Sequence, residues 1–335
     1  MTVLITGGAG YIGSHCCVAF LAAGHDIVVL DNLSSSRMES LQRVGEISGR
    51  KIAFEQADVR DQAAVEVILR RYGCDSVVHF AGSKIPRESI DRPLDYYDNN
   101  VVGTHRLLSA MAATGVRRLI FSSTAAVYGM TGLDPVVEET QLHPMSPYGR
   151  SKLMTEWMLA DVAAAHDISY GVLRYFNVAG ADPGKRSGQS TPEATHLIKV
   201  ACQAALGQRE KMDIFGTDYE TPDGTCVRDY IHVTDLIAAH ALLLKHLRGG
   251  GESTTLNCAY GRGYSVREVV ETVRKVSGVE FRADEGPRRA GDPASITATG
   301  EKVRQMLGWV PQHDDLEEIV ETAFNWERHL MTRNR

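Results

Sequence analysis

MTVLITGGAGYIG, residues 1–13, opens the chain with a short apolar run followed by four closely spaced glycines. The apolar run at 3–6 predicts a strand, and the residues after Gly10 predict a helix. Glycines such as Gly7, Gly10 and Gly13 let the backbone turn tightly and approach a phosphate, and the helix N-terminus offers unpaired N–H groups. Strand, glycine turn and helix in this order predict a dinucleotide-binding site.

An acidic residue follows the second predicted strand. Asp31 comes directly after the apolar run at 26–30, about 20 residues beyond the glycines, as the dinucleotide fingerprint requires. Its carboxylate can accept hydrogen bonds from ribose hydroxyls, and its charge repels a 2′-phosphate, so NAD is expected rather than NADP. The plain alternative is a glycine-rich turn with an unrelated aspartate. The neighbouring Arg37 could in principle meet a 2′-phosphate.

The first half of the chain alternates apolar runs with helical patterns. Continuously apolar strands are typical of a parallel sheet that is buried on both faces. The alternation predicts an α/β fold with a doubly wound (Rossmann) parallel sheet. Strands are expected at 3–6, 26–30, 51–54, 76–80, 119–122 and 170–174, and helices at 11–23, 37–44, 62–72, 94–114 and 147–166.

The pattern changes after Asn177. Residues 179–191 are rich in Gly, Pro and Ser and predict a long loop, and later elements are shorter. We expect an NAD-binding Rossmann domain at 1–176 and a smaller C-terminal α/β lobe at 177–335 that binds a nucleotide-sugar, with some elements returning to the main domain. In this lobe we expect helices at 195–206, 233–247 and 266–276 and a strand at 254–258.

Composition limits the class of protein. The 335 residues carry a net charge of −6, so there is no basic excess to meet nucleic acid or a membrane surface. The apolar stretch at 236–247 is too short to span a bilayer, and the N-terminus lacks the basic start of a signal peptide. The six cysteines form no C-x-x-C pair. They predict reduced cytoplasmic thiols and no metal site.

Tyr148 and Lys152 form a Tyr-x-x-x-Lys pair directly after Pro147, a residue that suits a helix start. Residues four apart share a helix face, and an ammonium beside a phenol lowers the pKa of that phenol. Tyr148 is therefore a candidate general base. Thr124 supplies a hydroxyl after the strand at 119–122. The plain alternatives are a surface contact for the pair and a turn-capping hydroxyl for Thr124.

Six motifs extend along nearly the whole chain: TGGAGYIG (6–13), FAG (80–82), YYDNN (96–100), SSTAAVYG (122–129), SPYGRSK (146–152) and LRYFN (173–177). Together they resemble the extended short-chain dehydrogenase/reductase family, and within it the UDP-sugar 4-epimerases. The resemblance implies that Tyr148 is the catalytic base, that Lys152 assists it and holds the nicotinamide ribose, and that Thr124 hydrogen-bonds the sugar O4.

Cofactor contacts are expected at the glycine loop and at the strand ends, and the resemblance implies further ones. Taken alone, the segments at 58–59 and 80–82 could be ordinary loops. The expected NAD-binding residues are Gly7, Gly10, Tyr11, Ile12, Gly13, Asp31, Asn32, Ser35, Ser36, Asp58, Val59, Phe80, Ala81, Gly82, Lys84, Asn99, Ser122, Tyr148, Lys152 and Phe176.

Substrate contacts are implied by the resemblance, and arginine forks suit phosphate. On sequence alone, Arg288 and Arg289 could belong to a solvated basic loop. His196-Leu197 replaces the more usual Asn-Leu, and a histidine can also donate a hydrogen bond. Ser295 replaces a bulky tyrosine of some members, which predicts room for an N-acetyl group. The expected substrate residues are Lys84, Thr124, Tyr148, Asn177, His196, Leu197, Arg228, Arg289, Asp292 and Ser295.

The function implied is reversible C4 epimerisation of UDP-hexoses, UDP-glucose and UDP-galactose, through a 4-keto intermediate with tightly bound NAD, in galactose metabolism. Related 4,6-dehydratases carry an Asp-Glu pair where Ala125-Ala126 stand here, and alanines transfer no proton. The alternatives are a UDP-GlcNAc or UDP-pentose 4-epimerase, an NAD-dependent nucleotide-sugar dehydrogenase/reductase, and a non-catalytic NAD-sensing protein. The resemblance also implies a homodimer through the helices at 94–114 and 147–166.

Overall fold

The apolar run before the glycine loop forms an inner strand of a seven-stranded sheet in the computed structural model, which describes residues 1–191, 195–289 and 291–333. The strand order is β11-β6-β5-β4-β1-β2-β3, and the pairs from β3 to β5 run parallel. The strands are β1 (Thr2–Thr6), β2 (Asp26–Asp31), β3 (Ala53–Gln56), β4 (Cys74–His79), β5 (Arg118–Thr124), β6 (Ser169–Tyr175) and β11 (Thr254–Cys258).

The order in which the chain adds strands reverses between β1 and β4, which run parallel. The chain adds β2 and β3 on one side of β1 and then returns to place β4 on the other side. Such a switch point opens a crevice at the carboxyl ends of the two strands, where ligands bind in this architecture. The predicted doubly wound α/β fold is confirmed.

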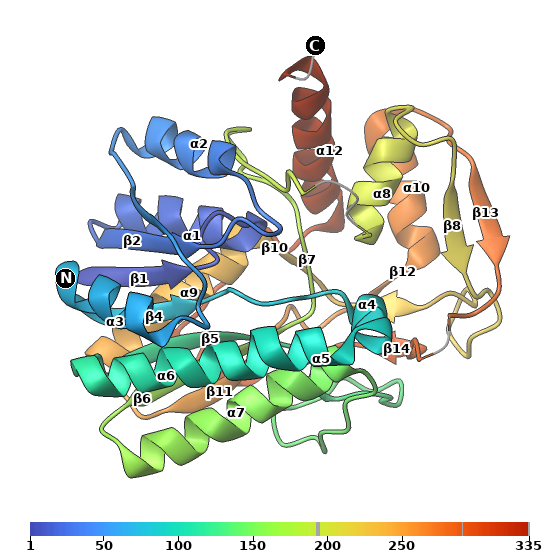
Figure 1. Ribbon diagram of the computed structural model, residues 1–335. Coiled ribbons are helices and arrows are strands. Elements are labelled where there is room, and N and C mark those ends of the chain that lie inside the picture. Colours follow the sequence, from blue (N-terminus) through green and yellow to red (C-terminus); the bar gives the residue numbers. More distant parts are fainter. Residues whose placement is uncertain (192–194, 290, 334–335) are drawn as a thin grey trace. The chain divides into compact units, whose positions relative to one another are not determined.

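Helices cover both faces of this sheet. One face carries α3 (Gln62–Arg71), α6 (Gly103–Thr114) and α7 (Pro147–Ala165), whose apolar side chains join a buried cluster with β1, β2 and β4. Figure 1 shows α6 and α7 lying side by side along the sheet. The other face carries α1 (Tyr11–Ala22), α2 (Met38–Ser48) and part of α9 (Val233–Arg248). Gly171 of β6 meets the Leu243 side chain of α9 so closely that a Cβ there would lie 2.5 Å from it.

The helix expected at 94–114 is interrupted. It consists of α5 (Pro93–Tyr96), a π-helical segment η1 (Tyr97–Val102) and α6. A short helix, α4 (Pro86–Asp91), precedes α5, and a 3₁₀ turn, η2 (Ala125–Val127), follows β5. π-Helical turns insert an extra residue and occur often at functional sites. The strand expected at 51–54 lies two residues later, at Ala53–Gln56.

The chain divides into two compact units. The first contains Met1–Gly129, Gln141–Arg174 and Ile237–Leu256, and the second contains Met130–Thr140, Tyr175–Leu236 and the described chain from Asn257 onward. The boundary expected after residue 176 stays a prediction. The elements that supply the second unit are β7 (Asn177–Ala179), α8 (Leu197–Ala205), β8 (Met212–Phe215), β9 (Val227–Arg228), β10 (Tyr230–His232), β12 (Tyr264–Ser265), α10 (Val266–Ser277), β13 (Ala283–Gly286), β14 (Ser295–Ile296), α11 (Glu301–Leu307) and α12 (Leu316–Arg333).

Candidate active site

The glycine loop lies at the switch point of the first unit. Gly7 has a φ of +70°, and a Cβ there would lie 2.7 Å from the Ala81 nitrogen, so only glycine lets the loop approach the end of β4. A Cβ on Gly13 would lie 2.7 Å from Gly8 Cα. Helix α1 begins at Tyr11, and Gly10 gives no side-chain cap to its first amides within the described chain. These amides and the close backbone fit the diphosphate of a dinucleotide.

Three contacts hold the Asp31 carboxylate in place, and one of them comes from Ser36, a predicted cofactor residue. Its Oδ2 accepts the Ala9 N–H at 3.1 Å, and its Oδ1 accepts the Ser36 hydroxyl at 2.8 Å and the Leu33 N–H at 2.9 Å. The side chain is buried, and Leu33 has a left-handed φ of 59°. A strained non-glycine turn beside a buried carboxylate is typical of a binding site.

Replacing Asp31 with alanine should weaken the binding of NAD and reduce the discrimination against NADP. Removing the charge removes the repulsion of a 2′-phosphate, so the ratio of NADP to NAD affinity should rise by roughly 10- to 100-fold. Fluorescence titration of the stripped protein with each cofactor measures this ratio. Asp26→Ala, at the exposed start of the same strand, is the matched control. An unchanged ratio in Asp31→Ala would contradict the assignment.

Other predicted cofactor residues lie along the same end of the sheet. Asn32 Nδ2 donates to Asp58 Oδ2 at 3.0 Å, and the guanidinium of Arg60 holds the pKa of Asp58 well below its usual range. Val59 is buried and packs closely against Gly103, because a Cβ on that glycine would lie 2.9 Å from Val59 Cγ1. The Phe80 ring packs 5.1 Å from the His240 ring. These contacts, all within the first unit, keep the second, third and fourth strand ends in fixed positions.

Lys152 is buried on α7, one turn after Tyr148. Its Nζ donates to the Ser122 carbonyl at 2.9 Å and lies 4.7 Å from the Phe121 ring centroid. Burial lowers the pKa of Lys152 to about 8, and the nearby charge of Glu156 opposes that shift. α7 starts as predicted at Pro147, because the Ser146 hydroxyl accepts the Gly149 N–H at 3.2 Å.

The Thr124 side chain lies near Tyr148 in the first unit, where hydrogen bonding to its hydroxyl favours the phenolate. Desolvation of the phenol raises the pKa of Tyr148, and this hydrogen bond lowers it. The expectation that the pKa lies below its ordinary value is therefore wrong for the protein alone, because loss of water around the phenolate outweighs the stabilising contacts. The Tyr148 ring lies edge-on to the Tyr96 ring, with centroids 6.4 Å apart.

The π-helical segment holds a site residue that the sequence reasoning missed. Asn100 is buried, and its Oδ1 accepts the Ser83 N–H at 2.8 Å. Its Nδ2 donates to Ser83 O at 3.0 Å and to the Ser151 hydroxyl at 2.9 Å. Asn100 thus links the loop after β4 to the residue before Lys152. The neighbouring Asn99, a predicted cofactor contact, donates to the Ser83 hydroxyl at 3.1 Å.

A buried ion pair that involves the same helix as Tyr148 and Lys152 was also missed. Glu156 accepts the Ser123 hydroxyl at 2.5 Å and pairs with Arg174 at 2.6 Å, and both charged side chains are buried. Arg174 also donates to the Tyr128 hydroxyl at 3.0 Å. Glu156 lies four residues after Lys152, so the helical spacing that identified Tyr148 and Lys152 extends to this carboxylate.

In the second unit, short strands bring predicted substrate residues together. Ser295 of β14 is buried and pairs with Val227 of β9, which places it one register position from Arg228. β7 pairs with β10, and the Asn177 side chain donates to the Asp229 carbonyl at 3.1 Å. Asp229 is buried, which raises the pKa of its carboxyl to about 7.

Arg289 and Asp292 lie on one turn, where the Asp292 N–H donates to the Arg289 carbonyl at 3.3 Å. The Arg289 guanidinium lies 3.6 Å from the ring centroid of Phe215, an aromatic residue that the sequence reasoning missed. Arg288 takes a different role, because it pairs with Asp218 at 2.7 Å and covers the Tyr219 ring. Both arginines are exposed, but among the described residues only Arg288 forms an ion pair with a carboxylate.

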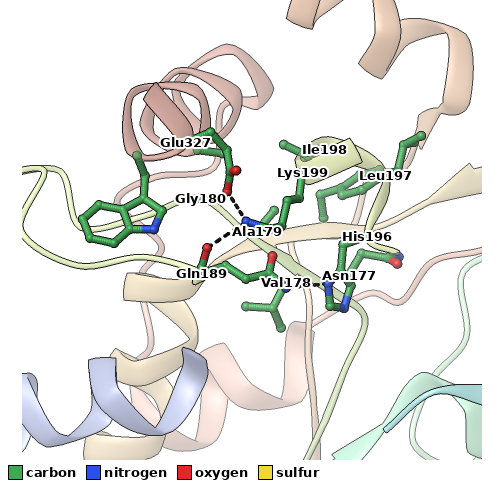
Figure 2. Close-up of a pocket in the computed structure, with 13 residues that line it drawn as sticks. Asn177, Val178, Ala179, Gly180, Gln189, His196, Leu197, Ile198, Lys199 and Glu327 are labelled. Atoms are coloured by element: carbon green, nitrogen blue, oxygen red, sulfur yellow. Dashed lines mark hydrogen bonds and ion pairs between the residues drawn. The ribbon is translucent and has the colours of Figure 1, made fainter. Parts of the chain in front are cut away.

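A pocket in the second unit contains His196, Leu197 and Asn177 (Figure 2). Its polar lining includes Gln189 and the buried Lys199–Glu327 ion pair. Three of the predicted substrate residues therefore line one pocket, whereas Arg228, Arg289 and Asp292 do not line it. Phe176, a predicted cofactor contact, also belongs to this unit.

Two further properties concern the described residues only. None of their helices combines the length and the apolar character needed to cross a membrane. Over the same residues, no group of three or more His, Cys, Asp or Glu side chains is arranged to hold a metal ion.

Comparisons with known proteins give consistent results. The sequence profile of the "NAD dependent epimerase/dehydratase family" matches residues 3–259. The UDP-glucose 4-epimerase of Azospirillum brasilense is 52% identical over 98% of this chain and 92% of its own. A UDP-glucose 4-epimerase structure from Stenotrophomonas maltophila, with bound NAD and formylated UDP-arabinopyranose, is 41% identical over all of both chains, with a TM-score of 0.96. The UDP-Glc/GlcNAc 4-epimerase of Campylobacter jejuni is 46% identical over 98% of this chain and 99% of its own, with a TM-score of 0.85.

Proposed function

The chain belongs to the NAD dependent epimerase/dehydratase family, and from this premise we propose that it interconverts UDP-glucose and UDP-galactose by inverting C4. The observation that carries this function is the similarity to UDP-glucose 4-epimerases, which extends over nearly the whole chain. The sugar passes through a 4-keto intermediate. The cofactor is NAD.

NAD, when bound, supplies the hydride acceptor and donor that inversion at C4 needs. The glycine loop and α1 would hold its diphosphate, and Asp31 would hold the adenosine ribose. Lys152 would hold the nicotinamide ribose. The close backbone at Gly7 and the start of α1 directly after the glycine loop support this assignment.

Tyr148 takes the proton from the sugar 4-hydroxyl and later returns it. Thr124 hydrogen-bonds the sugar O4, and its effect in lowering the pKa of Tyr148 supports that role. Lys152, with its positive charge buried on the same helix face, favours the phenolate. Ala125 and Ala126 carry no acidic group, so the site has no second proton donor there for elimination of water.

The second unit anchors the nucleotide diphosphate. We assign Arg228 and Arg289 to the phosphates, Asp292 to the uridine ribose, and Asn177, His196 and Leu197 to the adjoining contacts. Two observations support this assignment. The exposed guanidinium of Arg289 lies over the Phe215 ring. Asn177, His196 and Leu197 line the same pocket. Anchoring at the nucleotide leaves the sugar ring free to present its other face.

Incubating the purified protein with UDP-galactose, without added cofactor, tests the function. Appearance of UDP-glucose is expected, and NADH retained on the protein should absorb near its usual band. Turnover only when NAD is added would favour a dehydrogenase/reductase. UDP-GlcNAc and a UDP-pentose in the same assay test the alternatives. Turnover of UDP-GlcNAc is expected, because the residue near the 2-substituent is the small Ser295. If none of these UDP-sugars is epimerised, the proposal is wrong.

Thr124→Val should move the acid limb of the kcat/KM profile to higher pH. Without the hydroxyl the phenolate loses a hydrogen bond, so the pKa of Tyr148 rises further and less phenolate exists at neutral pH. At pH 7 the value should fall roughly 10- to 100-fold, and part of the loss should return as the pH is raised. Thr124→Ser keeps the hydroxyl and should keep the acid limb. A loss of the same factor at every pH would argue against this role.

We also propose that the protein is a cytoplasmic homodimer. All six cysteines are free and buried, as expected of a reducing compartment. Exposed apolar side chains gather on the helices expected to pair, with Leu94 78% and Trp157 58% exposed, and α6 and α7 together line a pocket. The mass in solution by light scattering tests the dimer, and cell fractionation tests the compartment.

A further inference from the structure

Gln189 contacts the ring of His196 in the second unit (Figure 2). Its Nε2 lies 2.7 Å from His196 Nδ1, and the Gln189 side chain is buried. An amide N–H can only donate, so the imidazole nitrogen that receives it must be unprotonated. A neutral histidine in this contact carries its proton on Nε2.

The backbone of Gln189 is held from two sides. Lys199 Nζ donates to the Gln189 carbonyl at 2.9 Å and forms an ion pair with Glu327 of α12. Both charged side chains of this pair are buried. The preceding Gly188 lies against the Trp326 indole, where a Cβ would be 2.5 Å from Cγ. Gln189 is therefore held close to His196 by groups that belong to α8 and α12.

We propose that Gln189 is a positioning residue that fixes His196 as the Nε2–H tautomer, so that the ring offers a hydrogen-bond donor to the diphosphate of the UDP-sugar. Phosphate oxygens only accept hydrogen bonds, and the other tautomer would turn a lone pair toward them. This inference rests on the proposed role of His196 in binding the nucleotide-sugar. Lys199 and Glu327 support the arrangement by holding the Gln189 backbone.

The tautomer can be read in the unmodified protein. Nitrogen-15 NMR of the histidine-labelled holoenzyme, with the His196 signals assigned through His196→Asn, reports which ring nitrogen carries the proton. An unprotonated Nδ1 is expected. A protonated Nδ1 in the neutral ring would overturn the proposal, and this result does not depend on any variant at position 189.

Kinetics and nucleotide binding supply the second test. Gln189→Leu should raise the KM for UDP-galactose and the Kd for UDP roughly tenfold, with kcat within about twofold, as expected for one hydrogen bond to a charged group. Gln208→Glu, at an exposed position of the same unit, is the control and should change neither value. In a His196→Asn background, Gln189→Leu should have no further effect, because an amide has no tautomer to fix.

The outcomes separate the inference from the proposed function. If the protein epimerises UDP-galactose but His196→Ala leaves the Kd for UDP unchanged, the inference fails and the function stands. If Gln189→Leu weakens UDP binding equally in the His196→Asn background, Gln189 acts independently of the ring and the inference also fails. If no epimerisation occurs, the proposed function fails, and the NMR result still reports the tautomer.

Discussion

Replacing Tyr148 with phenylalanine should lower kcat for UDP-galactose about 10²- to 10⁴-fold, the usual contribution of a positioned general base. The substitution removes one oxygen atom and keeps the ring, which packs edge-on against Tyr96. Substrate binding should change little, because the residues that we propose to anchor the nucleotide belong to the second unit. The measurement is the initial rate of UDP-glucose formation under saturating substrate.

Two controls make the Tyr148→Phe result specific. Tyr72 lies at the end of α3, where its hydroxyl donates to Glu55. Tyr72→Phe should keep full activity. The amount of NAD retained by Tyr148→Phe should match that of the unmodified protein, which shows that the cofactor site has survived. Full epimerase activity in Tyr148→Phe would contradict the role of Tyr148 as the general base.

Replacing Glu156 with glutamine should lower the free energy of unfolding by about 3–5 kcal/mol. The substitution removes the carboxylate that pairs with the buried Arg174 guanidinium, and breaking a buried ion pair by removing one partner is strongly destabilising. It also weakens the hydrogen bond that holds Ser123, the residue before Thr124. Urea unfolding followed by far-UV circular dichroism gives the change.

The pair itself predicts a compensating variant. When both charges are removed, as in Glu156→Leu with Arg174→Met, no charge is left buried and unpaired, so much of the lost stability should return. The exposed pair between Arg50 and Asp26 is the control, and Asp26→Asn should cost less than about 1 kcal/mol. A loss in the double variant equal to the sum of the two single losses would show that the charges do not depend on each other.

The first unit was largely predictable from the sequence because its signals are local. The apolar strands end at polar or glycine residues, and their buried faces follow from the alternation with helices. The glycine loop and the Tyr148–Lys152 spacing need no distant contact to be recognised. The π-helical segment is an exception, because the Asn100 hydrogen bonds that accompany it come from Ser83 and Ser151. Sequence spacing does not reveal such contacts.

The second unit was less predictable because its strands are short and pair over long distances. β8 and β13 contain four residues each, and they pair although Met212 and Ala283 are far apart in the chain. The contact between Lys199 and Glu327 joins α8 to a C-terminal helix that the sequence reasoning did not name. The roles of Arg228, Arg289 and His196 came from resemblance, and the structure adds Gln189 and Phe215 beside them.

The position of β11 has a consequence for synthesis of the chain on the ribosome. β11 completes the cofactor-binding sheet beside β6, but β6 ends at Tyr175 and β11 begins at Thr254. During translation, β6 therefore emerges well before its outer neighbour, with the apolar Val172 and Leu173 on an unpaired edge. Unpaired edges invite pairing with other chains. The nascent protein should depend on chaperones most strongly in this interval, and a chain released before Thr254 should aggregate.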